Sequence, residues 1–263
     1  MRELFRYEWR TNRRSFVIWT LIIVLFQMMF AGFGDLYMSN EDMLKLLEQF
    51  PPAVLEGFGL HAELMTSFEG WMASEPLVFY MLLLGAFAAI WAASAGVRER
   101  DAGTADFMYT LPLSRCRIFL GKAAAHVSGL LLIAALSYGA TLLFGSLFST
   151  VRDPGILFLY TAASVLTALA FAGIGYALSV AVSSERAGMA VSIGIVILSF
   201  LFHMLAGMHE SLSWLSRLSL FTAFSGIDLF LDGSLPWPAV FITIVLYAGG
   251  LAGGRWWLSR RDL

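Results

Sequence analysis

The stretch RERDAGTADFMYTLPLSRCRIFLGKAAAH, residues Arg98 to His126, is rich in charged side chains and contains a glycine and a proline. One long apolar run ends at Val97, just before it, and another starts at Ala123, near its end. Of the 263 residues, 59% are hydrophobic and only 14% are charged, so the charges are confined to short segments between apolar ones. This distribution is typical of a membrane protein and not of a water-soluble domain.

Six runs contain no Asp, Glu, Lys or Arg, and each has about the 18 or more residues that a helix needs to cross a hydrocarbon layer. They are Phe16–Gly34, Pro76–Val97, Ala123–Phe148, Gly155–Val182, Ala187–Met208 and Trp237–Gly254. None alternates polar and apolar residues, which favours helices over barrel strands. The sequence therefore predicts an all-α membrane protein with six transmembrane helices, forming a single transmembrane domain over residues 1–263.

The basic residues predict the orientation, because Lys and Arg are retained on the cytoplasmic side of a membrane. With the N-terminus inside, all of the 17 basic residues except Lys45, Arg152 and Arg217 fall on the inner side. Both termini are therefore expected to be cytoplasmic. The first run is too long for a signal peptide and lacks a small-residue cleavage site, so it is interpreted as an uncleaved anchor.

The first residues, MRELFRYEWRTNRR, form an amphipathic pattern. Apolar side chains, Trp9 among them, share one helical face, and Arg2, Arg6 and Arg10 share another. We expect an N-terminal interfacial helix in which Arg2, Arg6, Arg10 and Trp9 anchor the chain to the inner leaflet. The alternative is that the arginines only set the topology.

Two longer segments are expected on the outer side, residues 35–75 and 209–236. The first contains a predicted amphipathic helix that starts at Ser39 and stops at two prolines. The second is too apolar for a free loop and too interrupted for a span. It predicts short re-entrant helices in the outer interface between the fifth and sixth spans.

Several catalytic motifs are incomplete. The GFGD at Gly32–Asp35 matches half of an intramembrane aspartyl protease, but none of the six runs supplies the second aspartate that this chemistry needs. Gly121–Lys122 lacks the upstream glycine and the following Ser or Thr of a nucleotide-binding loop. We therefore expect no enzyme activity, no catalytic residue, no metal site and no cofactor in this chain, and no nucleic-acid partner.

The opening stretch itself predicts a defined local structure. Charged residues follow the second span, and Gly103 then breaks the helix. A short helix is expected from about Thr104 to Leu111, with Phe107 and Met108 on it, and Pro112 follows. Ser114 can cap the helix that leads into the third span. A short helix held across the membrane surface suits a groove in a soluble partner. An amphipathic turn that merely lies on lipid is the alternative.

At these residues the sequence resembles a known family. Glu99, Gly103–Thr104, Leu111–Pro112, Ser114–Arg115 and Gly121–Lys122 are similar to the "E…GT…L-P-x-SR…GK" pattern that follows the second span of ABC-2-type permeases. These permeases are the membrane subunits of one class of ATP-driven exporter. The resemblance also covers the six-span layout, the Arg-rich N-terminus, the apolar outer segment before the last span and the terminal RRDL, and so extends over the whole chain.

The resemblance implies a complex of two permease chains, the same or homologous, with two ATPase subunits that bind ATP and Mg. The first and fifth spans would face the partner permease, and the complex would lie in the plasma membrane, here expected to be bacterial. Thr104–Leu111 would be the coupling helix, with Ser183–Arg186 as a second contact and Glu99 anchoring the end of the second span. The expected ATPase-coupling interface comprises Glu99, Gly103, Thr104, Phe107, Met108, Leu111, Pro112, Ser114, Arg115, Ser184 and Glu185.

The spans suit an amphipathic or lipid-like cargo, such as a peptide or an antibiotic, because they contain no charge that would serve an ion path. The acidic outer segments fit attraction of a cationic cargo, or they result simply from the loss of Lys and Arg from the outer face. A different class stays open: an ATPase-coupled scaffold or sensor that regulates another membrane protein without transporting cargo. Vectorial movement of a cargo in vesicles separates these two classes.

Small residues recur at helical spacing in two spans. They are Ala88, Ala92 and Gly96 in the second span, and the pairs Gly249/Gly253 and Gly250/Gly254 in the sixth. Such stripes permit close approach of helices, either within one subunit or between two.

Overall fold

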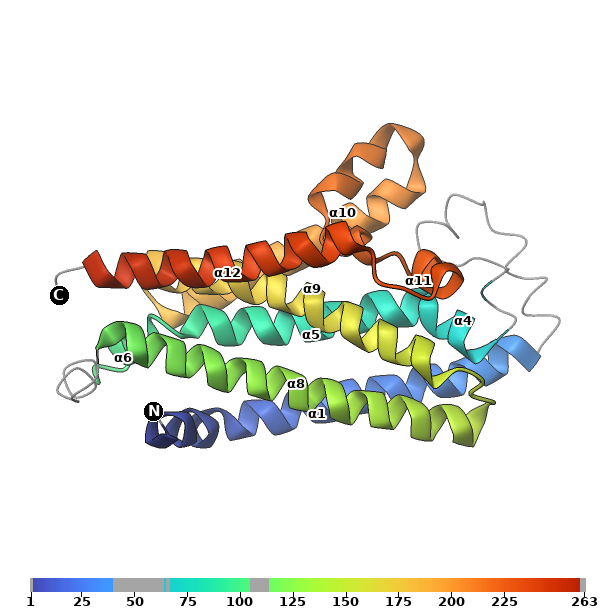
Figure 1. The fold of residues 1–263 in the computed structure, drawn as a ribbon, viewed down its shortest axis with the longest axis horizontal. Helices are drawn as coiled ribbons and strands as arrows, with labels where there is room; N and C mark the ends of the chain where they lie inside the picture. Colours follow the sequence, from blue (N-terminus) through green and yellow to red (C-terminus); the bar gives the residue numbers. More distant parts are fainter. Residues whose placement is uncertain (1, 40–63, 65–66, 105–113, 261–263) are drawn as a thin grey trace.

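The computed structural model describes residues 2–39, 64, 67–104 and 114–260, and the regular structure in these residues is helical. The long helices are α1 (Arg2–Ser39), α5 (Glu75–Ser94), α8 (Arg115–Phe148), α9 (Pro154–Ala181), α10 (Glu185–Met208) and α12 (Trp237–Arg260). The short ones are α4 (Phe68–Ala73), α6 (Arg98–Asp101), η2 (Glu210–Leu218), η3 (Thr222–Phe224) and α11 (Gly226–Asp232). Figure 1 shows both chain termini and α6 at one end of the bundle, called here the terminal end. Helices α4 and α11 lie at the opposite end, called the far end.

The six long helices are each long and apolar enough to cross a membrane, which agrees with the number of spans predicted from the charge-free runs. At the terminal end, helix α8 begins at Arg115, eight residues before the charge-free run that starts at Ala123. The predicted cap at Ser114 is present: the Ser114 hydroxyl accepts from the Arg117 amide at 3.4 Å. Charged residues are thus accommodated in the first turns of a helix that then becomes apolar.

The predicted N-terminal interfacial helix is not a separate element. Arg2 to Ser39 form one continuous helix, α1. The reason lies in the sequence, because no glycine or proline occurs between Arg2 and Ala31 to interrupt the helix. The N-terminal turns are therefore an extension of the first span.

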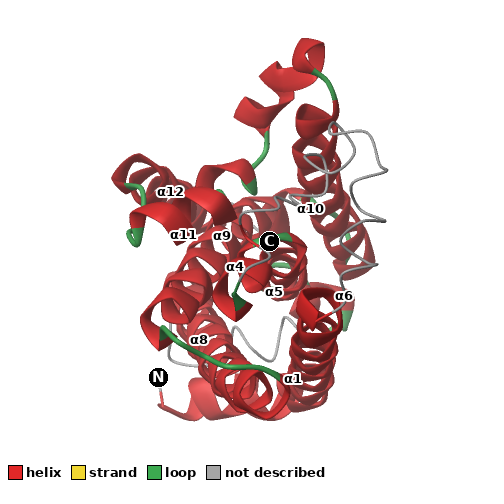
Figure 2. Ribbon diagram, turned by 90° about the vertical axis from the view of Figure 1, so that its right-hand side faces the viewer, coloured by secondary structure: helices red, strands yellow, loops and turns green. Residues whose placement is uncertain are grey.

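Helix α5 lies at the centre of the bundle, with the other long helices around it (Figure 2). In its most apolar window 67% of the residues are buried, against 22% in α1 and 17% in each of α10 and α12. The peripheral helices consequently present broad apolar faces outward.

One small-residue stripe in each of the two spans packs within the chain. A Cβ atom added to Gly175 on α9 would lie 2.7 Å from the carbonyl oxygen of Ala89 on α5, and one added to Gly250 on α12 would lie 1.9 Å from the carbonyl oxygen of Gly173 on α9. These backbones approach too closely for any larger side chain. By contrast, Gly249 and Gly253 have nothing within 4 Å. The Gly250/Gly254 pair thus has an intramolecular role, as does the α5 stripe that contains Ala92.

At the far end the buried helix α4 is held by polar contacts to backbone atoms. The Trp71 indole donates to the Phe30 carbonyl of α1 at 2.8 Å. One carboxylate oxygen of Glu69, a residue only 2% exposed, accepts from the amides of Arg152 at 2.5 Å and Asp153 at 2.8 Å, in the loop between α8 and α9. Helix α4 therefore fastens α1 to that loop.

Between α10 and α12 the chain forms η2, η3 and α11 in succession. The Ser219 hydroxyl, at the end of η2, donates to the Ser199 carbonyl of α10 at 2.8 Å, so this segment is bonded back to the bundle. That these short helices re-enter the membrane stays a prediction. The amphipathic helix predicted from Ser39 onward lies outside the described residues.

Candidate functional site

The candidate site lies at the terminal end, where the chain leaves α5. A tight turn after Ser94 leads into α6, and Gly103 then adopts a φ of +67°. This left-handed conformation is one that glycine adopts readily and other residues only at a cost, and the predicted break at Gly103 is present. The Thr104 amide donates to the Glu99 carbonyl at 2.8 Å, which closes the turn.

A buried ion pair joins α6 to α8. The Lys122 ammonium lies 2.5 Å from each carboxylate oxygen of Glu99 and also donates to the Ala95 carbonyl at 2.9 Å. Lys122 is 2% exposed and Glu99 9% exposed. Two such charges are tolerated away from water only when each has the other as its partner. Glu99, expected to anchor the end of the second span, is thus bonded to the third.

Arg98 joins α6 to α10 and α1. Its Nε donates to the Glu185 carboxylate at 2.9 Å and its Nη1 to the Asn12 side-chain oxygen at 2.9 Å. The same Nη1 lies 4.0 Å from a carboxylate oxygen of Glu8. One guanidinium therefore bridges the starts of two long helices.

The other two residues of α6 bind the loop that precedes α10. Arg100 donates to the Val182 carbonyl at 2.8 Å, and the Asp101 carboxylate accepts from the Glu185 amide at 3.1 Å. The Ser184 hydroxyl caps α10 by accepting from the Ala187 amide at 3.2 Å. Helix α6, which precedes the predicted coupling helix, is thus bonded to the predicted second contact, Ser183–Arg186.

A second polar group extends this cluster into the bundle. Glu8 is buried on α1, where Asn12 donates to it at 3.2 Å, and a His126 ring nitrogen of α8 lies 4.0 Å from the same oxygen. The other ring nitrogen of His126 is 3.2 Å from the Tyr176 hydroxyl of α9. We call Glu8, Asn12, Arg98, Glu99, Lys122, His126 and Glu185 together the ion-pair cluster. It connects α1, α6, α8 and α10, and it reaches α9 through the Tyr176 hydroxyl.

Only Glu99 and Glu185 of this cluster belong to the interface expected from the sequence; Glu8, Asn12, Arg98, Lys122 and His126 do not. The spacing of Leu4, Glu8 and Asn12, each four residues apart, places them on one face of a helix, away from Arg6 and Arg10. That face is the buried one. The polar pair Glu8 and Asn12, four residues apart and opposite the arginines, is the sequence feature that indicates a face in contact with protein.

The residues expected to anchor the chain to the membrane have different environments. Arg6 and Arg10 are exposed, and Arg6 pairs with Glu3 at 3.0 Å. Trp9 instead packs on the bundle: its indole donates to the Ser128 hydroxyl of α8 at 3.2 Å. The side chain of Arg2 lies outside the described residues.

The expected coupling residues are only in part described. Gly103, Thr104 and Ser114 are exposed, and Arg115 is half-buried. Phe107, Met108, Leu111 and Pro112 lie outside the described residues. The structure describes the segments that flank these residues. They are α6, which the ion-pair cluster holds, and the capped start of α8.

The chain was compared with known proteins. The sequence model of the ABC-2 family transporter protein matches residues 2–263. The chain belongs to this ABC-2 transporter family. A comparison with curated proteins gives no match.

The protein is thus a multi-pass membrane permease of an ABC transporter. Permeases of this kind work with an ABC ATPase and have a transport role that is not catalytic. Within the described residues no group of three or more His, Cys, Asp or Glu side chains could hold a metal ion. The chemistry of the site is therefore that of bonded charges between helices.

Proposed function

We propose that this permease receives the movement of an ATPase at the terminal end of its bundle and uses it to export an amphipathic or lipid-like cargo. One observation carries the proposal: α6, which leads directly into residues 105–113, is bonded to α1, α8 and α10 by the ion-pair cluster. A partner that displaced the coupling helix would displace α6, and through it three long helices at once.

The burial of the cluster supports such a transmission. Separating a buried ion pair leaves an uncompensated charge, at a cost of about 3–5 kcal/mol. Lys122 and Glu99 are both almost fully buried, so this pair stays formed while α6 moves. Helices joined in this way shift as one body.

The proposed orientation places the terminal end in the cytoplasm. Exposed basic side chains gather there, which fits the retention of Lys and Arg on the cytoplasmic side. They are Arg6, Arg10, Arg13, Arg14 and Arg117. In this orientation residues 104–111 meet a cytoplasmic ATPase, and a bacterial plasma membrane is the proposed location.

The proposed assembly has two permease chains and two ATPase subunits, which bind the ATP and Mg. The outward apolar faces of α1 and α10, the first and fifth spans, support a contact with a second permease chain. The exposed side chains there include Val17, Leu21, Leu25, Ile197, Leu198 and Leu201. Their broad exposure suits contact with an apolar partner within the membrane.

Purification in mild detergent tests the coupling. The tagged chain is isolated from its native membranes, and co-purifying proteins are identified by mass spectrometry. We expect an ATPase with a nucleotide-binding loop, lost from the variant Phe107→Ser/Leu111→Ser. The control, Trp214→Ser/Leu218→Ser, likewise replaces an aromatic residue and a leucine by serine, at exposed positions of η2, and should retain the ATPase. Equal recovery of the ATPase with both variants would contradict the proposed coupling helix.

Export is tested separately, with the purified complex in vesicles. ATP-dependent enrichment of a fluorescent amphiphile on one side of the membrane is expected. ATPase stimulation without any such movement would contradict export and favour a scaffold or sensor.

A further inference from the structure

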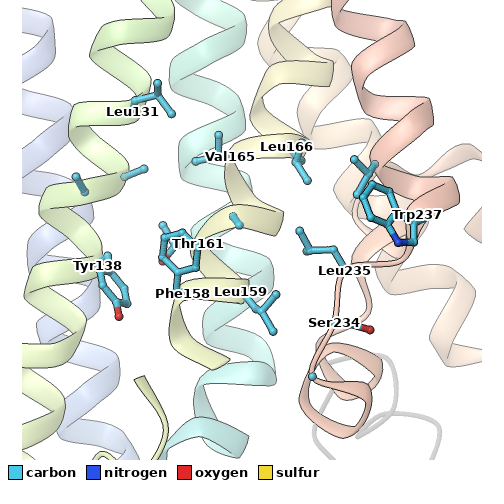
Figure 3. Close-up of a pocket in the computed structure, with 15 residues that line it drawn as sticks. Leu131, Tyr138, Phe158, Leu159, Thr161, Val165, Leu166, Ser234, Leu235 and Trp237 are labelled. Carbon is cyan, nitrogen blue, oxygen red and sulfur yellow. The ribbon is translucent and has the colours of Figure 1, made fainter. Parts of the chain in front are cut away.

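A large apolar groove lies on the side of the bundle between α8 and α12, away from the ion-pair cluster. Its volume is about 860 Å³, and its floor is the far half of α9 (Figure 3). Leu131 and Tyr138 of α8 form one wall, Phe158 and Leu166 of α9 the floor, and Leu235 and Trp237 the other wall. We call this the far groove.

Close packing elsewhere explains why the groove exists. Helix α12 meets α9 through Gly250 and Gly173, and toward the terminal end it touches α8 at one point, where a Cβ atom on Gly254 would lie 2.9 Å from the Phe119 ring. Toward the far end, the side chains of α8 and α12 leave a gap between the two helices. The surface of α9 is uncovered in this gap.

The polar groups inside the far groove are already satisfied. The Tyr138 hydroxyl donates to the Pro154 carbonyl at 3.1 Å, and the Thr161 hydroxyl donates to the Leu157 carbonyl at 3.0 Å. An occupant therefore finds hydrocarbon contacts there and no free donor. This selects an alkyl chain over a polar ligand.

The rim beside Leu235 has the opposite character. Ser234 is exposed toward the far end, and Trp237, which is 81% exposed, stands on the α12 wall (Figure 3). Neither the Ser234 hydroxyl nor the Trp237 indole has a hydrogen-bond partner among the residues described. Tryptophan is enriched where a protein meets the headgroup layer, because its ring is apolar and its N–H is polar. The rim thus offers donors to a headgroup directly beside an apolar channel.

The length of the groove matches one leaflet. Leu131 to Tyr138 span about 10 Å along α8, and Phe158 to Leu166 span about 12 Å along α9, at about 1.5 Å per residue. Half of a bilayer's hydrocarbon core is about 15 Å thick. An acyl chain of a single leaflet fits this depth.

A second groove supports the same reading. It has a volume of about 600 Å³, lies between the same two helices near the terminal end, and has Cys116 and Arg255 at its border. No residue lines both grooves. A transmembrane helix from a second copy would need one continuous channel, whereas lipid chains from opposite leaflets need two separate ones.

We propose that the far groove is a binding site for one membrane phospholipid, whose acyl chain lies against α9 between α8 and α12 and whose headgroup meets Ser234 and Trp237. The lipid is a resident part of the permease and fills the space that the diverging helices leave open. This inference requires only that the chain spans a bilayer, and it stands or falls independently of coupling to an ATPase.

Photolabelling tests the site. The protein is reconstituted in phosphatidylcholine vesicles with a trace of phosphatidylcholine that carries a diazirine in mid-chain, and labelled residues are identified by mass spectrometry. We expect at least fivefold more label on Leu131 and Leu166 than on Leu132 and Leu136, which lie at a similar depth on α8 and are exposed but do not line the groove. Equal labelling of the two sets would overturn the proposal.

Two variants and one further condition sharpen the test. Ala162→Phe fills the far groove and should reduce label on Leu131 and Leu166 at least fivefold. Gly139→Phe adds a ring on α8 where nothing lies within 4 Å, and should leave that label unchanged. Label that persists in Ala162→Phe would contradict the site. Label that disappears when the assembled transporter hydrolyses ATP would mark a transported amphiphile and contradict a resident lipid.

Discussion

The two ends of this permease are held together by different interactions. At the terminal end, charged and polar side chains bond to one another across α1, α6, α8 and α10. At the far end, the side chains of Glu69 and Trp71 bond to backbone atoms of neighbouring segments. The first arrangement joins several long helices at one point, whereas the second fastens a short helix and a loop over the bundle.

This difference indicates how the ends serve transport. A buried charge cannot leave its partner without a large cost, so under the proposed function the helices joined by the ion-pair cluster move together. The far end has its contacts on α4, which is bonded locally to α1 and to the loop between α8 and α9. We therefore regard the terminal end as the part that transmits movement and the far end as the part that keeps the outer structure in place.

The largest expected effect is that of breaking the Glu99–Lys122 pair from one side. Lys122→Met leaves the Glu99 carboxylate buried without a counter-charge, which should lower the free energy of unfolding by about 3–5 kcal/mol. Thermal unfolding in detergent measures it. The control Glu99→Leu/Lys122→Met removes both charges and should recover most of the loss. If the double variant is as unstable as the single one, the pair is not the cause.

At the far end, Glu69→Ala leaves the amides of Arg152 and Asp153 without their acceptor. Hydrogen bonds to a charged group contribute about 1.5–3 kcal/mol, so a loss of about 2 kcal/mol is expected in the same unfolding assay. Glu69→Gln keeps a carbonyl oxygen as acceptor and should lose less than half as much. Stimulation of the ATPase by either folded variant should be normal. A defect in stimulation there would remove the distinction between the two ends.

A smaller effect is expected where the chain turns after α6. Gly103→Ala forces a side chain into the left-handed conformation at φ +67°, at a cost of about 1 kcal/mol. Gly139→Ala, in the interior of α8 with open space around it, should instead stabilise by about 0.5–1 kcal/mol. Opposite signs of the two changes in unfolding free energy would confirm that the turn is set by backbone conformation; equal signs would contradict it.

The smallest effect on stability belongs to the Arg98–Glu185 pair, whose side chains are about a quarter exposed, at 24% and 25%. Solvent screening limits such pairs, so a double-mutant cycle with Arg98→Met and Glu185→Gln should give a coupling of about 0.2–1 kcal/mol. Each of these variants should lose more ATPase stimulation than its small loss of stability would explain. A coupling near zero together with normal stimulation would exclude this pair from the transmission.

Much of the fold could be predicted from the sequence, because lipid excludes charge so strongly that the six charge-free runs coincide with six long helices. The turn at Gly103 and the helix start at Ser114 could also be predicted, because each depends on the residue itself. Gly103 adopts a left-handed backbone conformation, and the Ser114 hydroxyl caps α8. The charge-free run marks only the apolar part of α8, because Lys122, just before Ala123, keeps its charge paired inside the bundle.

The interior of the site was harder to predict, since it depends on which helices meet. Glu8 and His126 are far apart in sequence, and only packing of α1 on α8 brings them within 4.0 Å. The far groove could not be predicted from the sequence. Leu131 lines it and Leu132 does not, yet both are leucines on the same helix. Hydrophobicity alone does not distinguish a groove from a lipid-facing surface.

The most direct test of the central claim uses Glu99→Leu/Lys122→Met, assembled with its ATPase in vesicles. The measurement is permease-stimulated ATP hydrolysis, with Glu69→Gln as the control from the far end. If the ion-pair cluster transmits movement, the double variant folds and binds the ATPase but loses stimulation at least tenfold, while the control retains it. Full stimulation by the folded double variant would contradict the account.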